Sequence, residues 1–296
     1  MARPFRFGVS MVALSTGDEW REKCRRAEAL GYDVILVADH LGMPSPFPSL
    51  VAAAEATERP RVGTFVLNAG FWNPTLLARE VATADQLTGG RLELGLGTGY
   101  VRPEHDVAGL PWGTPGERVD HLRGTIEELD RLLGSDEHQP QPLQRPRPPL
   151  LVGGNGDRML KLTAEHADIA AFTGAKAAPG DSSGKMSHLT PEELDERIAT
   201  YRRLAAGRSQ PAELNLLTQL VEVTGDRRRA IKPLLDYIPH LTEDAALDLP
   251  LLLVGTVRQI ADQLRAQRER YGFSYITVLE PYLEAFGPVI EELGDE

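Results

Sequence analysis

The chain has 296 residues, of which 42% are hydrophobic and 25% charged, an ordinary balance for a globular enzyme. Its formal net charge of -11 argues against a broad surface for nucleic acids or acidic membranes, which would need a basic face. Cys24 is the single cysteine, so an internal disulfide and a cysteine-based zinc site are excluded. No apolar run approaches the roughly 18 residues of a membrane span. Residues 1–20 also lack the apolar core of a signal peptide, and we therefore expect a cytoplasmic protein.

Short apolar segments alternate with helical patterns along the chain. The predicted strands cover residues 5–10, 33–38, 62–67, 91–97, 149–154, 168–172, 213–225 and 275–279. The predicted helices cover residues 18–30, 48–58, 74–90, 115–133, 157–167 and 191–207. A mostly helical stretch follows to about residue 271, interrupted near 249–256, and a last helix closes the chain. The strands are apolar on consecutive residues, as expected where both faces of a parallel sheet are buried.

Eight strand and helix units in 296 residues favour one closed (β/α)8 TIM barrel over residues 1–296. The alternative is an open, doubly wound sheet. We expect two additions to the barrel, a polar insertion around 174–188 and a helical insertion around 226–256. In such barrels the chemistry collects at the carboxyl ends of the strands, so the residues that follow each strand are the candidates for a site.

The second predicted strand ends in Asp39 and His40. An imidazole at this place is either a hydrogen-bonded structural group or a general acid or base, since histidine titrates near neutral pH. The strand-end position favours the functional interpretation. The other histidines are dispersed, and no His or carboxylate cluster has the spacing of metal ligands.

Two glycine-rich segments follow later strands. "GLGTGY" (95–100) lacks the spacing of a dinucleotide fingerprint and is either a turn or a backbone wall for a flat ring. "GGNGDR" (153–158) opens a helix whose free N–H groups suit a phosphate, with Arg158 as a further contact. The alternative is a tight turn in which Asn155 or Asp157 caps the helix.

With these motifs in order, the chain resembles the bacterial luciferase-like superfamily. It is most similar to the branch that uses the deazaflavin coenzyme F420. The resemblance spans nearly the whole chain and is carried by "ADH" (38–40), "TFVLNAGFWNP" (64–74), "DQLTGGRLELGLGTGYVRPEHDVAGLPW" (85–112), "LLVGGNGDRMLKLTAEHAD" (150–168) and "LVGTVRQIADQL" (253–264).

The resemblance implies a role for each motif. Asp39 and His40 would lie beside the deazaflavin ring, with His40 as acid or base. A non-prolyl cis peptide between Phe65 and Val66 would support the ring's back face. Thr98 and Gly99 would touch the ring or its side chain. The phosphate would be held by Gly153, Gly154, Asn155, Gly156 and Arg158.

The chain departs from the sugar-phosphate dehydrogenases of this branch in two places. It has Tyr100 where they carry Glu after the "GTG" turn, and Pro44 where they carry Trp. Both departures argue against a sugar phosphate substrate. They also leave Tyr100 and Glu104 as the nearest candidates for the second acid or base.

The loop after the third predicted strand carries two aromatic residues. Phe71 and Trp72 suggest a partly aromatic substrate pocket, although packing beneath the loop would explain them equally well.

We therefore expect an F420-dependent oxidoreductase that moves a hydride between the cofactor's C5 and a small organic, secondary-metabolite or modified-peptide substrate. The reaction would be reduction of a C=C or C=N bond, or alcohol oxidation. The alternatives are an FMN-dependent monooxygenase of the same fold and a non-catalytic cofactor-binding barrel. The anionic tail of F420 would need basic residues at the rim, for which Arg102, Arg158 and Lys161 are candidates. The family habit is a homodimer.

Overall fold

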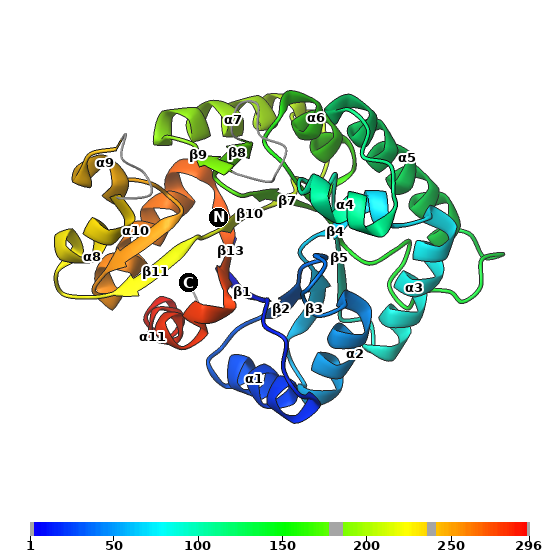
Figure 1. Cartoon of the computed structure of the whole chain (residues 1–296), viewed down its shortest axis with the longest axis horizontal. Helices are drawn as coiled ribbons and strands as arrows, with labels where there is room; N and C mark the ends of the chain where they lie inside the picture. The colour runs from blue at the N-terminus through cyan, green and yellow to red at the C-terminus, as the bar shows by residue number, and fades with distance from the viewer. Residues whose placement is uncertain (1–2, 178–185, 236–240, 295–296) are drawn as a thin grey trace.

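Parallel strands close into a barrel around a packed interior (Figure 1). The computed structural model describes residues 3–177, 186–235 and 241–294. Within them, β4 (Leu67–Asn68) continues the line of β3 along β5, and β1 pairs with β13 to close the ring. The barrel strands are β1 (Arg6–Met11), β2 (Val34–Val37), β3 (Arg61–Thr64), β5 (Leu92–Gly97), β6 (Leu150–Gly153), β7 (Ile169–Phe172), β10 (Glu213–Leu217) and β13 (Phe273–Leu279). The predicted (β/α)8 barrel is confirmed.

Helices surround the barrel and bury their apolar faces against it (Figure 1). They are α1 (Gly17–Ala29), α2 (Pro46–Ala56), α3 (Pro74–Leu87), α5 (Pro115–Leu133), α6 (Asp157–His166), α7 (Pro191–Leu204), α10 (Val257–Tyr271) and α11 (Leu283–Leu293). Threonine capping boxes begin several of them, so these helices start where the local sequence satisfies the free N–H groups. None of the helices in the described ranges is both long and apolar enough to cross a bilayer.

A buried ion network fills the end of the barrel where the strands begin. Glu93 is only 2% exposed and accepts hydrogen bonds from Arg6 and Arg61 at 2.8–3.1 Å. The Arg6 guanidinium also lies 4.2 Å from the ring centroid of Tyr275, which is itself fully buried. Side chains therefore fill the barrel at this end.

The predicted strand 213–225 is divided in two. Its first part is β10, but its second part, β11 (Leu220–Val223), leaves the barrel and pairs in parallel with β12 (Leu252–Gly255). The expectation of a helical insertion over 226–256 is thus correct for α8 (Arg227–Leu235) and α9 (Glu243–Leu247) and wrong for β12. The reason is a separate apolar cluster, in which β12 packs under α8 and α9.

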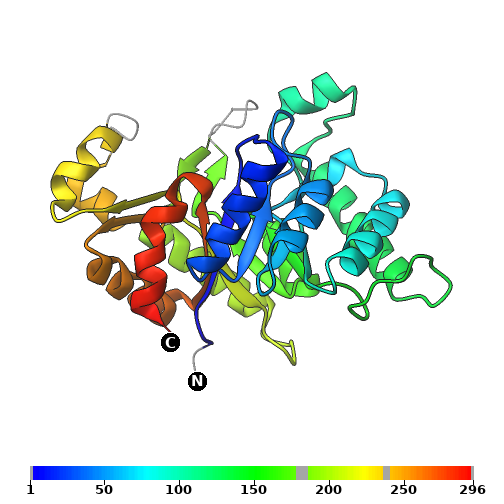
Figure 2. The same cartoon turned by 90° about the horizontal axis from the view of Figure 1, so that it is seen from below.

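Four short elements at the other end of the barrel were not predicted. The insertion around 174–188 forms an antiparallel pair, β8 (Ala175–Ala177) and β9 (Met186–His188), while residues 178–185 lie outside the described ranges. The other two are the 3-10 turn η1 (Ala69–Phe71) and the helix α4 (Arg102–Ala108). Figure 2 shows both chain ends at the lower edge of the molecule, with α4 and the β8–β9 pair toward the opposite edge.

Candidate active site

Asp39 follows β2 and is held by the segment that follows β3. Its Oδ2 accepts hydrogen bonds from Trp72 Nε1 at 2.9 Å and from the Asn68 N–H at 3.2 Å. Burial raises the pKa of the Asp39 carboxyl above its ordinary value, and these two hydrogen bonds offset only part of the effect. Both donors meet the same oxygen, so neither bond uses Oδ1.

His40 lies between a carboxylate and a phenol. Its Nδ1 is 2.9 Å from Glu104 Oε1, and its Nε2 is 3.2 Å from the Tyr100 hydroxyl. Because an ionised carboxylate can only accept, we assign the proton of the neutral ring to Nδ1, which leaves the Nε2 lone pair facing Tyr100. The His40 and Glu104 side chains are 20% and 16% exposed, so water competes weakly for this contact. The structure thus brings together three of the predicted catalytic residues.

Tyr100 forms the outer end of this chain of groups. Burial and the negative charge of Glu104 raise the pKa of Tyr100 above its ordinary value, so the side chain is a phenol at neutral pH. It donates its proton toward His40 and is 48% exposed, which leaves it within reach of a ligand. A carboxylate, an imidazole and a phenol in this order can hold and move one proton.

The peptide bond between Phe65 and Val66 is cis, as the resemblance implied. Both side chains pack against apolar groups in the barrel interior. The facing strand β5 carries alternate glycines that admit this segment. A Cβ on Gly95 would lie 2.1 Å from Thr64 O, one on Gly97 2.8 Å from Val66 Cγ2, and one on Gly99 2.5 Å from Asn68 Oδ1. The "GLGTG" pattern is therefore explained first by close packing within the chain.

Thr98 and Gly99 lie where β5 ends. Gly99 has φ of +69°, a left-handed conformation that favours glycine, so the turn depends on this residue as well as the packing. Thr98 is half-buried, and among the described residues the hydrogen bond of its hydroxyl is to the neighbouring Gly99 carbonyl, at 3.4 Å.

The glycine motif after β6 leads into α6 with Gly156 at the N-cap. No side chain caps this helix, so the alternative in which Asn155 or Asp157 caps it does not hold. Asn155 Nδ2 donates to Ala175 O at 2.5 Å, whereas its Oδ1 is buried without a partner within the described residues. A Cβ on Gly156 would meet nothing within 4 Å. The free N–H groups and the open space fit a phosphate or another anion.

The cations expected at the rim each face a carboxylate. Arg158 contacts Asp120, while Arg102 lies 3.7 Å from Asp106 and Lys161 lies 3.9 Å from Glu165. Sequence reasoning missed Arg197 of α7, whose Nη1 donates to Asp157 at 2.5 Å and also contacts Asn155 O at 3.5 Å. It neutralises the acidic first residue of α6. No local signal could have identified it, because 40 residues separate it from Asp157.

The two aromatic residues of the loop contact protein groups. Trp72 donates to Asp39 and meets the Phe47 ring edge-on, with centroids 5.5 Å apart. Phe71 lies 4.9 Å from the His105 ring, which in turn lies 4.9 Å from Trp112. These contacts favour packing beneath the loop and give Trp72 a second role as a donor to Asp39.

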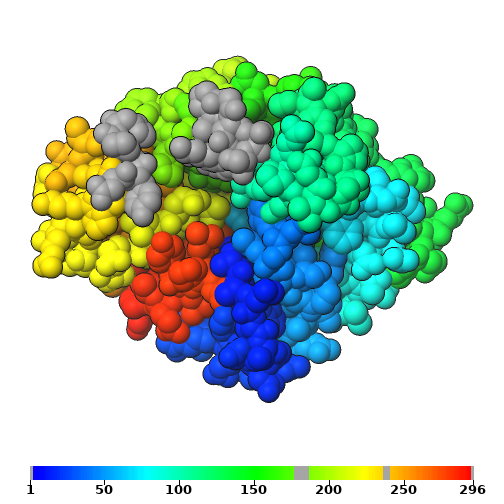
Figure 3. Space-filling model, in the orientation of Figure 1, coloured from blue at the N-terminus to red at the C-terminus, as the bar shows by residue number. Residues whose placement is uncertain are grey.

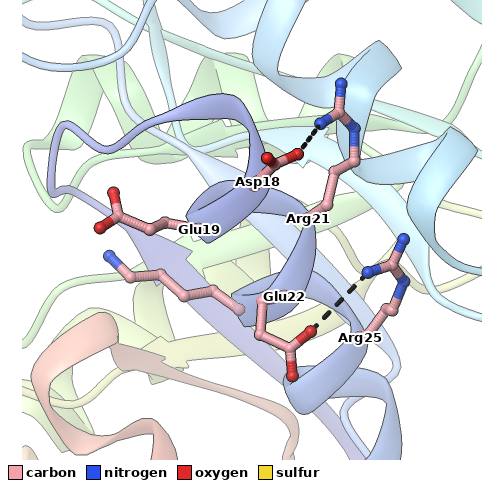
Figure 4. Close-up of a pocket in the computed structure, with 6 residues that line it drawn as sticks. Asp18, Glu19, Arg21, Glu22 and Arg25 are labelled. Carbon is pink, nitrogen blue, oxygen red and sulfur yellow. Dashed lines mark hydrogen bonds and ion pairs between the residues drawn. The ribbon is translucent and has the colours of Figure 1, made fainter.

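A shallow depression on α1 is the other feature with many charged groups, and Figure 4 shows it. Its lining side chains come from one exposed helix face, where Asp18 pairs with Arg21 and Glu22 with Arg25. This is an ordinary solvated surface. Across the described parts of the chain, no group of three or more His, Cys, Asp or Glu side chains could hold a metal ion.

Comparison with known proteins places these features in a family. The family described as luciferase-like monooxygenase matches residues 1–275. The oxygenase component of a flavin-dependent trigonelline monooxygenase from Acinetobacter baylyi is 32% identical over 46% of this chain and 42% of that protein. An F420-dependent glucose-6-phosphate dehydrogenase from Intrasporangium calvum is 37% identical over 36% of this chain and 35% of that protein. The chain thus spans less than half the length of these two curated relatives.

Solved structures share the fold over the whole chain. An F420-dependent secondary alcohol dehydrogenase has a TM-score of 0.77 and 17% identity, covering 99% of this chain and 100% of that one. A long-chain alkane monooxygenase has a TM-score of 0.75 and 15% identity, covering 99% and 92%. At these identities the likeness establishes the fold alone.

Proposed function

Because the chain belongs to the luciferase-like monooxygenase family, we propose that it is an oxidoreductase that uses coenzyme F420 and transfers a hydride between the cofactor's C5 and a small organic substrate. The observation that carries the proposal is the contact of His40 with both Glu104 and Tyr100 at the carboxyl ends of the strands. The relationship to F420-dependent glucose-6-phosphate dehydrogenases supports the choice of cofactor.

The residues present fit a cofactor of this kind. The uncapped start of α6, with its free backbone N–H groups, suits the phosphate group. Residues 153–156 and Arg158 would form this end of the site, and Phe65, Val66, Thr98 and Gly99 would line the ring. When bound, the deazaflavin supplies a carbon that accepts or gives a hydride.

His40 is the proton-handling group of the proposed reaction. Glu104 fixes the proton on Nδ1, so during alcohol oxidation Nε2 can take the phenolic proton of Tyr100 while Tyr100 takes the proton of a substrate hydroxyl. In the reductive direction His40 would first take up a proton on Nε2, and Tyr100 would then give its phenolic proton to the substrate and recover this Nε2 proton, which leaves the neutral Nδ1–H ring. Proton transfer by a positioned side chain contributes about 10²–10⁴ in rate.

The groups around His40 favour an uncharged substrate. Glu104 contacts the imidazole, Asp39 is the preceding residue, and Arg102 is paired with Asp106. A phosphate or carboxylate on the substrate would therefore meet negative potential. This agrees with Tyr100 and Pro44 standing where sugar-phosphate dehydrogenases have Glu and Trp. The substrate class we propose is a neutral secondary metabolite or modified peptide bearing an alcohol, or an activated C=C or C=N bond.

An FMN-dependent monooxygenase is the second candidate, supported by the flavin-dependent relative. The phosphate motif would serve either cofactor. The paired state of Arg102, Arg158 and Lys161 gives no preference for the anionic F420 tail.

Titration of the purified protein with oxidised F420 and, separately, with FMN, followed by fluorescence, separates the candidates. We expect micromolar or tighter binding of F420 and weaker binding of FMN. Preference for FMN would establish the second candidate, and binding of neither would overturn the cofactor assignment. Asn155→Asp should weaken binding, because it places a charge beside the phosphate. Asn73→Asp, at the N-cap of α3, is the matched control.

A further inference from the structure

A continuous series of contacts links the two neighbouring residues Asp39 and His40 through Asn68, His105 and Glu104. Asp39 accepts from the Asn68 backbone N–H at 3.2 Å, and the Asn68 side-chain Nδ2 lies 2.9 Å from His105 Nε2. The residue before His105 in the chain is Glu104, which returns to His40 at 2.9 Å. Asp39 is thus held by Asn68, and His40 is held by Glu104 of α4. The contact between Asn68 and His105 connects these two segments.

Both ring nitrogens of His105 are used. Pro111 O, 3.0 Å from Nδ1, can only accept, so Nδ1 carries the proton and Nε2 accepts from the Asn68 amide. The amide orientation agrees with this assignment, because Asn68 Oδ1 already accepts from the Gly70 N–H at 3.1 Å. His105 is 1% exposed, and a Cβ on Gly70 would lie 2.6 Å from its Cε1. The imidazole fits tightly in one orientation.

The helix that carries Glu104 has few other attachments. α4 has seven residues and no side-chain cap at Val101, and so short a helix is unstable without tertiary contacts. His105 is its one fully buried residue, whereas Val107 is 80% exposed. Figure 3 shows the blue-green segment around α4 standing at the surface of the molecule. The position of Glu104 relative to His40 therefore depends on how His105 is held.

We propose that His105 is a positioning residue that, through Asn68 and Pro111, holds α4 so that Glu104 keeps the proton of His40 on Nδ1. Its importance for turnover rests on the proposed function, whereas the effect on His40 does not require a cofactor. Loss of the His105 hydrogen bonds would release α4 and let the His40 proton move to Nε2, and a ring in that form cannot accept a proton there.

The test is ¹⁵N NMR of His40 in the cofactor-free protein at a pH where the ring is neutral. We expect the Nδ1–H tautomer in the wild type and a predominance of Nε2–H in His105→Phe, which keeps a ring between Phe71 and Trp112. His121→Phe is the control, since it removes a hydrogen bond from α5 to Ala69 O at 3.0 Å and no described hydrogen bond to α4. An unchanged tautomer in His105→Phe, or Nε2–H in the wild type, overturns the proposal.

Gly70→Ala keeps the imidazole and displaces it, so it replaces His105→Phe if that variant does not fold, and an unchanged tautomer there is equally decisive. With cofactor and substrate available, kcat should fall on the order of tenfold in His105→Phe with KM little changed. Failure to bind F420 would sink the proposed function while leaving the tautomer result intact, so the two outcomes are distinguishable.

Discussion

Glu104 Oε1 lies 2.9 Å from His40 Nδ1, although the two residues are 64 positions apart in the chain. The contact exists because α4 projects from the loop after β5 toward the end of β2, two strands away around the barrel. A carboxylate in this position orients an imidazole and stabilises its protonated form.

The hydroxyl of Tyr100 is the group that would meet the substrate. Tyr100→Phe should lower turnover by about a hundredfold while leaving cofactor affinity unchanged, because only the proton donor to His40 is removed. Turnover and fluorescence titration measure the two effects. Tyr201→Phe is a suitable control, since its buried hydroxyl has no hydrogen-bond partner among the described residues. Equal activity of Tyr100→Phe and the wild type would contradict the role of the phenol.

Replacing the Asp39 carboxylate by a neutral group should raise stability and lower activity. Its folded-state pKa is raised by burial, so at pH 7 its ionised form costs folding free energy that a neutral amide avoids. Asp39→Asn keeps an oxygen for Trp72 and Asn68, and we expect a Tm raised by a few degrees together with reduced activity. The exposed Asp18→Asn is the control for the thermal melt. A lower Tm in Asp39→Asn would show that the charge stabilises the fold.

Glu280 ties the loop after β1 to η2 (Glu280–Tyr282). Burial alone would raise its pKa, but hydrogen bonds from Lys23 at 2.5 Å and from the N–H groups of Ala13 and Val12 outweigh this, so the pKa lies below its ordinary value of 4.5. A carboxyl with a lowered folded-state pKa stabilises the protein above its unfolded-state pKa, and this stabilisation is lost as the pH falls through the folded value.

Glu280→Gln should therefore be less stable than the wild type at pH 7, by about 1–3 kcal/mol in urea unfolding. The difference should begin to shrink as the pH falls below about 4.5, where the carboxyl of the unfolded state protonates, and should vanish once the pH is below the lowered folded-state pKa. Lys23→Met removes only the ion pair and should produce part of the loss. A difference that does not depend on pH would mean that packing, and not charge, is responsible.

Two glycines in regular elements should respond in opposite ways to the same change. Gly95→Ala places a methyl group 2.1 Å from Thr64 O, a backbone atom that cannot move aside, and should cost about 3 kcal/mol or more. Gly124→Ala, inside α5 with nothing within 4 Å, should stabilise the protein by about 0.5–1 kcal/mol. Urea unfolding of both variants checks the pair. Tolerance of alanine at Gly95 would show that β3 and β5 can separate.

The barrel strands could be predicted from sequence because both of their faces are buried. Consecutive apolar residues such as 34–37 mark such a strand without any knowledge of its partners. The break between β10 and β11 could not be predicted, since the chain stays apolar across it and the departure depends on pairing with β12.

The same distinction holds in the site. Asp39 and His40 were recognisable because they end a strand, and Glu104 because it follows the glycine turn closely. Asn68 and His105 could not be recognised. Their roles arise from a contact between residues 37 positions apart in the chain, which no local sequence pattern predicts. Short polar residues in loops look alike until the fold brings their partners together.

The ion network around Glu93 also has a kinetic consequence. With that end of the barrel filled, the strand ends that carry Asp39 and His40 open to solvent on one side only. In the proposed function, cofactor and substrate would enter and leave through this same opening, so the ligand that binds deeper would bind first and leave last. Steady-state kinetics of the proposed reaction should then show ordered addition. The ligand at the glycine turn of β5 should bind before the ligand at Tyr100.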